Sequence, residues 1–174
     1  HDPSLERLAQ DIYRLDLQLE NSLILAQGDQ TQILIEDIPL SQIIPDLKNE
    51  LDSIQIELER DAVLKIDRRS VLSVLRNLMS NSVQHGKASL IRIQAKRQSD
   101  DMLMIRVEDN GKGDTRERAN LGRGPQGKHL NNLSSNGLGL YLSRNLLRKQ
   151  KGNLSFENSH QGFVALVEIP GRLL

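Results

Sequence analysis

Apolar residues recur at alternating steps of three and four along the first part of the chain. The pattern runs through Leu5, Leu8, Ile12, Leu15, Leu19 and Ala26, with Ser22 at the remaining seam position. This is the heptad spacing of a helix that packs against a partner helix, and Gly28 follows it as a stop signal. Because a lone amphipathic helix is marginal in water, the pattern predicts a long helix that associates, either in a hairpin or across a dimer.

Glycine, proline and polar residues then interrupt the apolar pattern and predict a linker. The expected organisation is a helical element at residues 1–27, a linker at residues 28–46 and a domain at residues 47–174. Helical spacing of apolar residues over 40–51 overlaps the end of that linker.

Patterns typical of strands and helices alternate along the remaining chain. Strands are predicted at residues 62–66, 89–95, 102–108, 153–158 and 162–169, and helices at residues 67–81 and 138–149. The strands 89–95 and 102–108 have the polar connection of an antiparallel hairpin. Residues 114–136, rich in Gly, Pro, Asn, Arg and Lys, are predicted to be a long mobile loop. We expect an α/β sandwich in which a mixed, largely antiparallel sheet packs on helices, preceded by one long coiled-coil-type helix.

Composition narrows the function classes. The 174 residues include no Cys, and 23 basic residues balance 23 acidic ones. A disulfide framework and a thiolate metal site are therefore excluded, and the balanced charge gives no reason to expect nucleic acid as a partner. No stretch approaches the roughly 20 apolar residues of a membrane span, so we expect a cytoplasmic location, with any membrane attachment through segments outside these residues.

The segment Asp109-Asn110-Gly111-Lys112-Gly113 follows a predicted strand. An aspartate at a strand end can direct its carboxylate toward a ligand, and the glycines allow the backbone to approach closely. A purine amino group suits such a carboxylate. The alternative is a simple tight turn, since Asp-Asn-Gly is also a common turn sequence.

Two further segments carry candidate chemistry. Asn77 and Asn81 stand one turn apart on a predicted helix and share a face, and an amide oxygen of Asn81 could bind Mg²⁺. Gly137-Leu138-Gly139-Leu140 lies where a loop enters a helix, where free N–H groups favour phosphate. Each has a plainer interpretation, namely solvated amides and an ordinary helix start.

The three segments together resemble the N, G1 and G2 boxes of sensor histidine kinases. They occur in the order of that family, as residues 77–85, 109–113 and 136–140. The first 27 residues are similar to the second helix of the family's dimerisation and phosphotransfer hairpin. The resemblance implies an ATP-binding domain with residues 114–136 as its lid.

The resemblance also implies roles for individual residues. Asp109 would accept from the adenine amino group, Asn81 would bind the Mg²⁺ of Mg-ATP, and Asn77 and His85 would line the ribose or phosphate side. The glycines would shape the backbone around the nucleotide, with Gly111 and Gly113 near adenine and Gly137, Leu138 and Gly139 near the phosphates. The chain departs from the family pattern at Gln84, where Lys or Arg is common, and at Phe163, where Thr usually follows the glycine.

The implied activity is a protein-histidine kinase that transfers the γ-phosphoryl group of ATP to a histidine and then to a response-regulator aspartate. His1, His129 and His160 do not fit the acceptor position, so we expect the acceptor upstream of these residues and no autophosphorylation by this chain alone. Homodimerisation through the helical hairpin is expected of the parent protein. Two alternatives stay open: an ATP-hydrolysing member of the same superfamily, and a degenerate nucleotide-binding or kinase-recruiting module.

Overall fold

The computed structural model describes residues 3–27, 32–50, 54–112, 135–157, 159 and 162–174. The chain divides into two compact units, residues 1–32 and residues 33–174, and each is described by itself.

The first unit contains one long helix, α1 (Pro3–Gln27). It covers the predicted range, because no proline or glycine interrupts the sequence between Pro3 and Gln27. Apolar side chains on α1 are more than half exposed at Leu8, Ile12, Leu15, Leu19 and Leu23. In the part of the chain that the structure describes, no helix is both long and apolar enough to cross a membrane.

The second unit begins earlier than the sequence pattern predicts. Residues 33–46, assigned above to the linker, belong to it, and they form β1 (Glu36–Pro39), the short 3-10 helix η2 (Leu40–Gln42) and the start of α2 (Ile44–Glu50). Strand β1 pairs antiparallel with β3 (Ala62–Ile66). The side chains of Ile38, Leu40 and Ile43 are buried in the core of the second unit, which is why this segment belongs to that unit and not to a linker.

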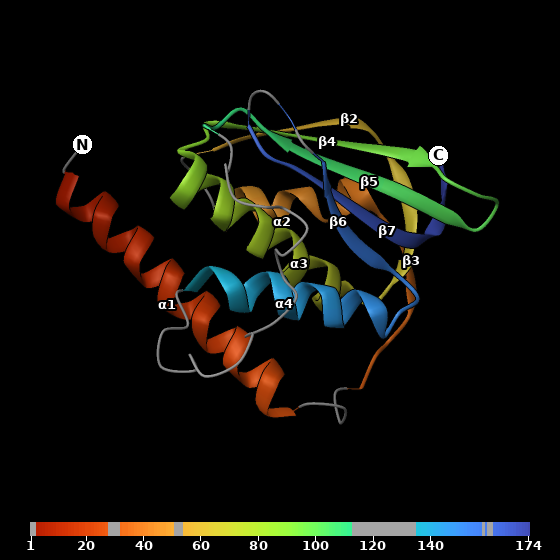
Figure 1. The fold of residues 1–174 in the computed structure, drawn as a ribbon, viewed down its shortest axis with the longest axis horizontal. Helices are drawn as coiled ribbons and strands as arrows, with labels where there is room; N and C mark the ends of the chain where they lie inside the picture. Colours follow the sequence, from red (N-terminus) through yellow and green to blue (C-terminus); the bar gives the residue numbers. More distant parts are fainter. Residues whose placement is uncertain (1–2, 28–31, 51–53, 113–134, 158, 160–161) are drawn as a thin grey trace. The chain divides into compact units, whose positions relative to one another are not determined.

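A mixed sheet of seven strands forms one layer of this unit. The remaining strands are β2 (Gln55–Arg60), β4 (Leu90–Arg97), β5 (Met102–Asp109), β6 (Asn153–Glu157) and β7 (Val164–Leu173). The order is β1-β3-β7-β5-β4-β2, with β6 also paired to β7, and every pair is antiparallel except β2 with β4. Helices α2, α3 (Arg68–Asn81) and α4 (Ser135–Arg148) cover one face of the sheet (Figure 1). The predicted α/β fold with a largely antiparallel sheet is confirmed.

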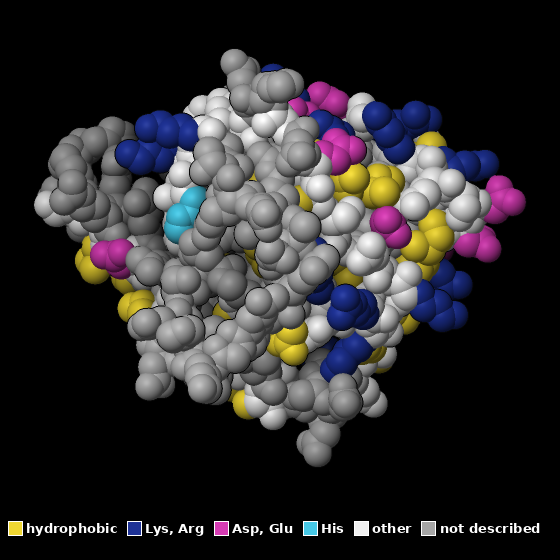
Figure 2. All heavy atoms as spheres, in the orientation of Figure 1, with side chains coloured by type: hydrophobic (Ala, Val, Ile, Leu, Met, Phe, Trp, Pro, Cys, Tyr) yellow, Lys and Arg dark blue, Asp and Glu magenta, His cyan; other side chains and the backbone are white. Residues whose placement is uncertain are grey.

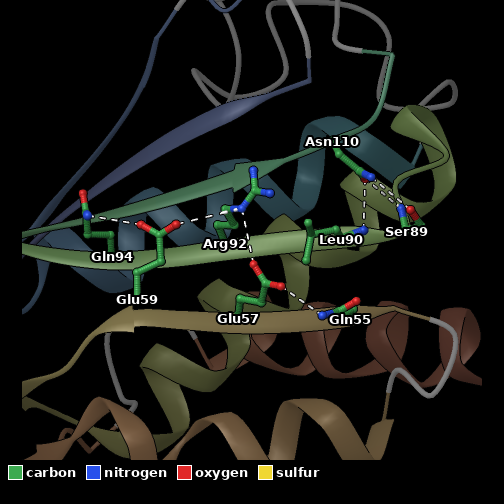
Figure 3. Close-up of polar contacts among 8 residues, drawn as sticks. All are labelled: Gln55, Glu57, Glu59, Ser89, Leu90, Arg92, Gln94 and Asn110. Carbon is green, nitrogen blue, oxygen red and sulfur yellow. Dashed lines mark hydrogen bonds and ion pairs between the residues drawn. The ribbon is translucent and has the colours of Figure 1, made fainter.

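The other face of the sheet carries paired charges. Arg92 on β4 lies 3.3 Å from Glu57 on the neighbouring strand β2, a strand that the sequence patterns did not indicate (Figure 3). Acidic and basic side chains are interspersed over the described surface drawn in Figure 2. Exposed pairs of this kind contribute little to stability, so the core layer of apolar side chains between sheet and helices is what holds the unit together.

Strand β7 runs four residues beyond its predicted end at Ile169. Its first half pairs with β5 and β6, and after Pro170 it pairs with β3 through Gly171. Proline lacks the N–H that a ladder needs, and it stands where β7 exchanges one neighbour for another. A Cβ atom at Gly171 would lie 2.4 Å from the carbonyl oxygen of Val63, so glycine permits the close pairing that follows.

Asp67 is buried and joins three segments of the second unit through its carboxylate and its backbone N–H. It caps α3 by accepting from the Ser70 N–H at 2.9 Å, and it accepts from the Leu34 N–H at 3.0 Å. Its own N–H donates to the side chain of Gln150, just beyond α4, at 2.7 Å. Burial of the carboxylate raises the pKa of Asp67. The hydrogen bonds from the Leu34 and Ser70 N–H groups and the charge of Arg69 lower it by more, so the pKa lies below its usual value.

The lowered pKa makes part of the stability pH-dependent. Asp67 contributes stability above its unfolded-state pKa, and the contribution is lost as pH falls through its folded-state pKa. We expect Asp67→Asn to lower the free energy of unfolding at pH 7 by about 1–2 kcal/mol, because the amide presents only one acceptor oxygen to the two N–H groups. Urea unfolding from pH 7 to pH 3 measures this. The variant should lose less stability on acidification than the unmodified chain, whereas an exposed control, Asp100→Asn, should follow the unmodified curve. Parallel pH profiles for all three proteins would contradict the assignment.

Candidate functional site

Asp109 is the last residue of β5, and the period of that strand turns its side chain toward the helices. Leu103, Ile105 and Val107 occupy the same face and are buried, and Asp109 is itself only 4% exposed. A carboxylate buried at the end of a core strand loses water as a partner and needs hydrogen bonds in return.

Only one oxygen of this carboxylate obtains such bonds from the described residues. Oδ1 accepts from the N–H of Gly111 at 2.9 Å and from the N–H of Phe163 at 3.1 Å. Oδ2 is buried and has no hydrogen-bond partner in the described part of the chain. The turn that the sequence offered as the alternative is present, and Oδ1 shapes it.

Three glycines allow the backbone to close around Asp109. A Cβ atom at Gly111 would lie 2.6 Å from the carbonyl oxygen of Gly86, and one at Gly162 would lie 1.8 Å from the carbonyl oxygen of Asp109. Gly162 also has a φ of +73°, which other residues rarely adopt. The N–H of Lys112 donates to the carbonyl of Gly86 at 2.8 Å. Larger side chains at positions 111 and 162 would force these backbone segments apart.

Asn110 fastens the same turn to the neighbouring strand. Its Oδ1 accepts from the N–H groups of Ser89 at 2.9 Å and Leu90 at 3.0 Å, and its Nδ2 donates to the Ser89 hydroxyl (Figure 3). The turn therefore holds Asp109 in place through side-chain and backbone contacts on both sides.

The end of α3 approaches Asp109 through an irregular turn. After Asn81 the chain forms the π-helical turn η3 (Ser82–Gly86), which ends at Lys87 with a φ of 51°. Gly86 is thereby brought against Gly111, since its Cβ position lies 3.6 Å from the Gly111 Cα. His85 is exposed on this turn and Asn81 is half-buried. The predicted N-box helix is thus present, with a π turn that its spacing did not reveal.

Asn77 contacts the beginning of α4. It is 3% exposed, its Nδ2 donates to the Ser143 hydroxyl at 3.4 Å, and its Oδ1 would lie 2.7 Å from a Cβ atom at Gly139. Helix α4 begins at Ser135, two residues before Gly137, so Gly137 and Leu138 lie in a first turn whose N–H groups lack partners within the helix. Such a turn favours anions.

Two of the close approaches connect the predicted segments. Gly86 and Gly111 join the end of α3 to the turn after β5, and Asn77 and Gly139 join α3 to α4. Gly113 and residues 114–134 of the predicted lid lie outside the described residues, as do His1, His129 and His160. Within the described ranges, no cluster of three or more His, Cys, Asp or Glu side chains could hold a metal ion.

Three residues of this region were not predicted: Gly86, Gly162 and Ser143. Gly86 lies in the short connection between the predicted helix 67–81 and strand 89–95, and Gly162 is the first residue of the predicted strand 162–169. Glycines in such connections and at strand ends are the signal that could have identified both. No local signal marks Ser143, because its role depends on the packing of α4 against α3.

Comparison with known proteins identifies the family of this chain. The family model described as "Histidine kinase-, DNA gyrase B-, and HSP90-like ATPase" matches residues 66–172. The chain is 26% identical over 108 residues to the sensor histidine kinase GlnK of Bacillus subtilis (strain 168), covering 60% of this chain and 26% of the relative. The chain therefore spans about a quarter of the length of that relative.

Solved structures of histidine kinases have the same fold. The histidine kinase AdeS of Acinetobacter baumannii superposes with a TM-score of 0.73 at 17% identity, over 98% of this chain and 85% of that one. The ATP binding domain of PrrB from Mycobacterium tuberculosis gives a TM-score of 0.59 at 22% identity, over 78% of this chain and 98% of that one. The family match covers more than half of the chain, including α3, β4, β5, the Asp109 turn, α4, β6 and most of β7. The chain therefore belongs to the family of histidine kinase-, DNA gyrase B- and HSP90-like ATPases.

Proposed function

We propose that this chain is the ATP-binding catalytic portion of a two-component sensor histidine kinase. The observation that carries the proposal is the buried Oδ2 of Asp109, which has no partner in the described residues and lies beside the glycine-lined approach of η3. A buried acceptor of this kind is costly unless a ligand supplies a donor, and the exocyclic amino group of adenine is such a donor.

The phosphate side of the nucleotide is proposed to lie between the end of α3 and the start of α4. Gly137 and Leu138, in the first turn of α4, would offer N–H groups to the phosphates, and Gly139, without a side chain, would leave room beside them. The half-buried amide of Asn81 would bind Mg²⁺ through its oxygen. Bound Mg²⁺ would neutralise charge on the phosphates during transfer. His85 is proposed to contact the nucleotide from the exposed turn η3. Gly111 and Gly113 would shape the adenine side.

In the proposed reaction a histidine nitrogen outside residues 1–174 attacks the γ-phosphorus of ATP. A P–N bond forms, the bond from the γ-phosphorus to the bridging oxygen breaks, ADP leaves, and the phosphoryl group passes later to a response-regulator aspartate. The parent protein would dimerise through a helical hairpin that contains α1, whose apolar stripe is exposed. It would act in the cytoplasm, with any membrane attachment through segments outside residues 1–174.

Hydrolysis of ATP is the less favoured reaction. Related enzymes that hydrolyse ATP need a general base beside the metal-binding residue, and here that position is the amide of Asn77. This amide is buried and donates to Ser143. An amide cannot accept a proton from water at neutral pH, which supports transfer to a positioned histidine instead.

Exchanging the Asp109 carboxylate for an amide tests adenine recognition. Asp109→Asn should keep one oxygen for Gly111 and Phe163 and place an NH₂ group where Oδ2 now lies. We expect ADP affinity to fall by about 10- to 100-fold, because two donors would face each other, while GDP, whose base presents a carbonyl oxygen there, should lose less or gain. Calorimetry with both nucleotides measures this. Equal losses for ADP and GDP, with an unchanged melting temperature, would exclude the assigned role.

Truncating the Asn81 side chain tests whether it binds Mg²⁺. We expect Asn81→Ala to bind ADP without Mg²⁺ as the unmodified chain does and to lose most of the increase in affinity that Mg²⁺ provides, by roughly tenfold. Calorimetry at several Mg²⁺ concentrations provides the comparison. Asn153→Ala, which removes an exposed amide on β6, is the matched control. A full Mg²⁺ effect in Asn81→Ala would place the metal elsewhere.

Labelled ATP distinguishes the kinase from the two other candidates. With [γ-³²P]ATP, a parent protein that extends upstream of residue 1 should acquire an acid-labile label on histidine, whereas residues 1–174 alone should remain unlabelled. Rapid Mg²⁺-dependent phosphate release without labelled histidine would instead indicate an ATPase. Failure to bind ADP at millimolar concentration would favour a degenerate interaction module, which the uncharged Gln84 keeps open.

A further inference from the structure

Side-chain hydrogen bonds fix α4 against α3 at both ends of the pair. At the end far from Asp109, the N–H of Asp67 donates to Gln150 at 2.7 Å, and Gln150 donates to the Leu146 carbonyl at 3.0 Å. At the near end, Asn77 donates to Ser143. The two helices therefore run antiparallel, with the start of α4 beside the end of α3.

Ser143 makes two hydrogen bonds, one to Asn77 on α3 and one to Gly139 near the start of α4. Its hydroxyl is completely buried, accepts from Asn77 Nδ2 at 3.4 Å and donates to the Gly139 carbonyl at 2.9 Å. A hydroxyl has one donor and two acceptor positions, so a single group satisfies both contacts without conflict.

Helices α3 and α4 pack closely where Asn77 meets Gly139. A Cβ atom at Gly139 would lie 2.7 Å from Asn77 Oδ1 and 3.1 Å from its Cγ. The backbone of α4 thus packs against the Asn77 amide, and the Ser143 hydroxyl contributes a hydrogen bond that favours the observed orientation of that amide. A shift of this amide would be passed directly to the turn that contains Gly137 and Gly139.

We propose that Ser143 is a positioning residue for the nucleotide phosphates, acting through Asn77 and Gly139. The proposal rests on the proposed function, because it assigns the first turn of α4 to the phosphates. Asp109 lies on β5 and holds the base independently of this contact. Loss of the Ser143 hydroxyl therefore weakens binding of the β- and γ-phosphates and leaves recognition of adenine intact.

Comparing the affinities for a nucleoside triphosphate and a monophosphate distinguishes a role of Ser143 in positioning the phosphates from a general loss of protein stability. The variants are Ser143→Ala, Ser143→Cys and, as the control at the far end of the same helix, Gln150→Met. Each is titrated with the nonhydrolysable triphosphate AMPPNP and with AMP, and its melting temperature is measured.

Ser143→Ala should bind AMPPNP about five- to tenfold more weakly and AMP equally well. Ser143→Cys, with a weak donor of similar size, should lie between it and the unmodified chain. Gln150→Met should lower the melting temperature with no change in the ratio of the two affinities.

Each alternative result has a distinct meaning. Unchanged AMPPNP binding by Ser143→Ala, or equal losses for AMPPNP and AMP, would overturn the positioning role. If Ser143→Ala does not fold, the same comparison is made with Ser143→Cys, and an unchanged affinity ratio there overturns it. If the unmodified chain binds neither nucleotide, the proposed function itself fails.

Discussion

The burial of one carboxylate constrains the rest of the second unit. Asp109 stands where β5 leaves the core, and the described residues around it supply backbone N–H groups to one of its oxygens only. Holding a charged group there requires the turn after β5, the start of β7 and the end of η3 to approach within van der Waals distance. Gly86, Gly111 and Gly162 make that approach possible. The same arrangement leaves Oδ2 without a hydrogen-bond partner among the described residues, and the proposed contact with adenine rests on this oxygen.

Strand β7 and helix α3 each have one end close to the Asp109 carboxylate. Phe163, directly before β7, donates its N–H to Asp109, and beyond Pro170 the other end of β7 pairs with β3. Helix α3 begins at the cap formed by Asp67 and ends in the π turn beside Gly111. The base and phosphate sides of the proposed site therefore rest on different elements: the sheet for the base, and the α3–α4 pair for the phosphates.

Much of the fold follows from local pattern. The alternation of buried positions in β5 places Asp109 on the core face, and helical spacing identified α3, α4 and α1 within a few residues. The patterns failed where stability comes from distant partners. Residues 36–39 resemble a linker but gain a ladder with β3, and β2 contributes few buried side chains of its own because it pairs at the sheet edge. Neither contact is visible in neighbouring residues.

By itself, the sequence determined which segments to consider as the candidate site: the Asp109 turn, the two amides one helical turn apart and the glycines near the start of α4. Their order and spacing were sufficient for the family, since those properties are local. Tertiary structure alone decided how these residues are arranged. Among the described residues, one oxygen of Asp109 has hydrogen-bond partners and the other has none, a π turn brings Gly86 to Gly111, and Ser143 lies beside Asn77. The contacts of Asp109 with Phe163, of Gly86 with Gly111 and of Asn77 with Ser143 join residues more than twenty positions apart in the chain, which short-range periodicity does not encode.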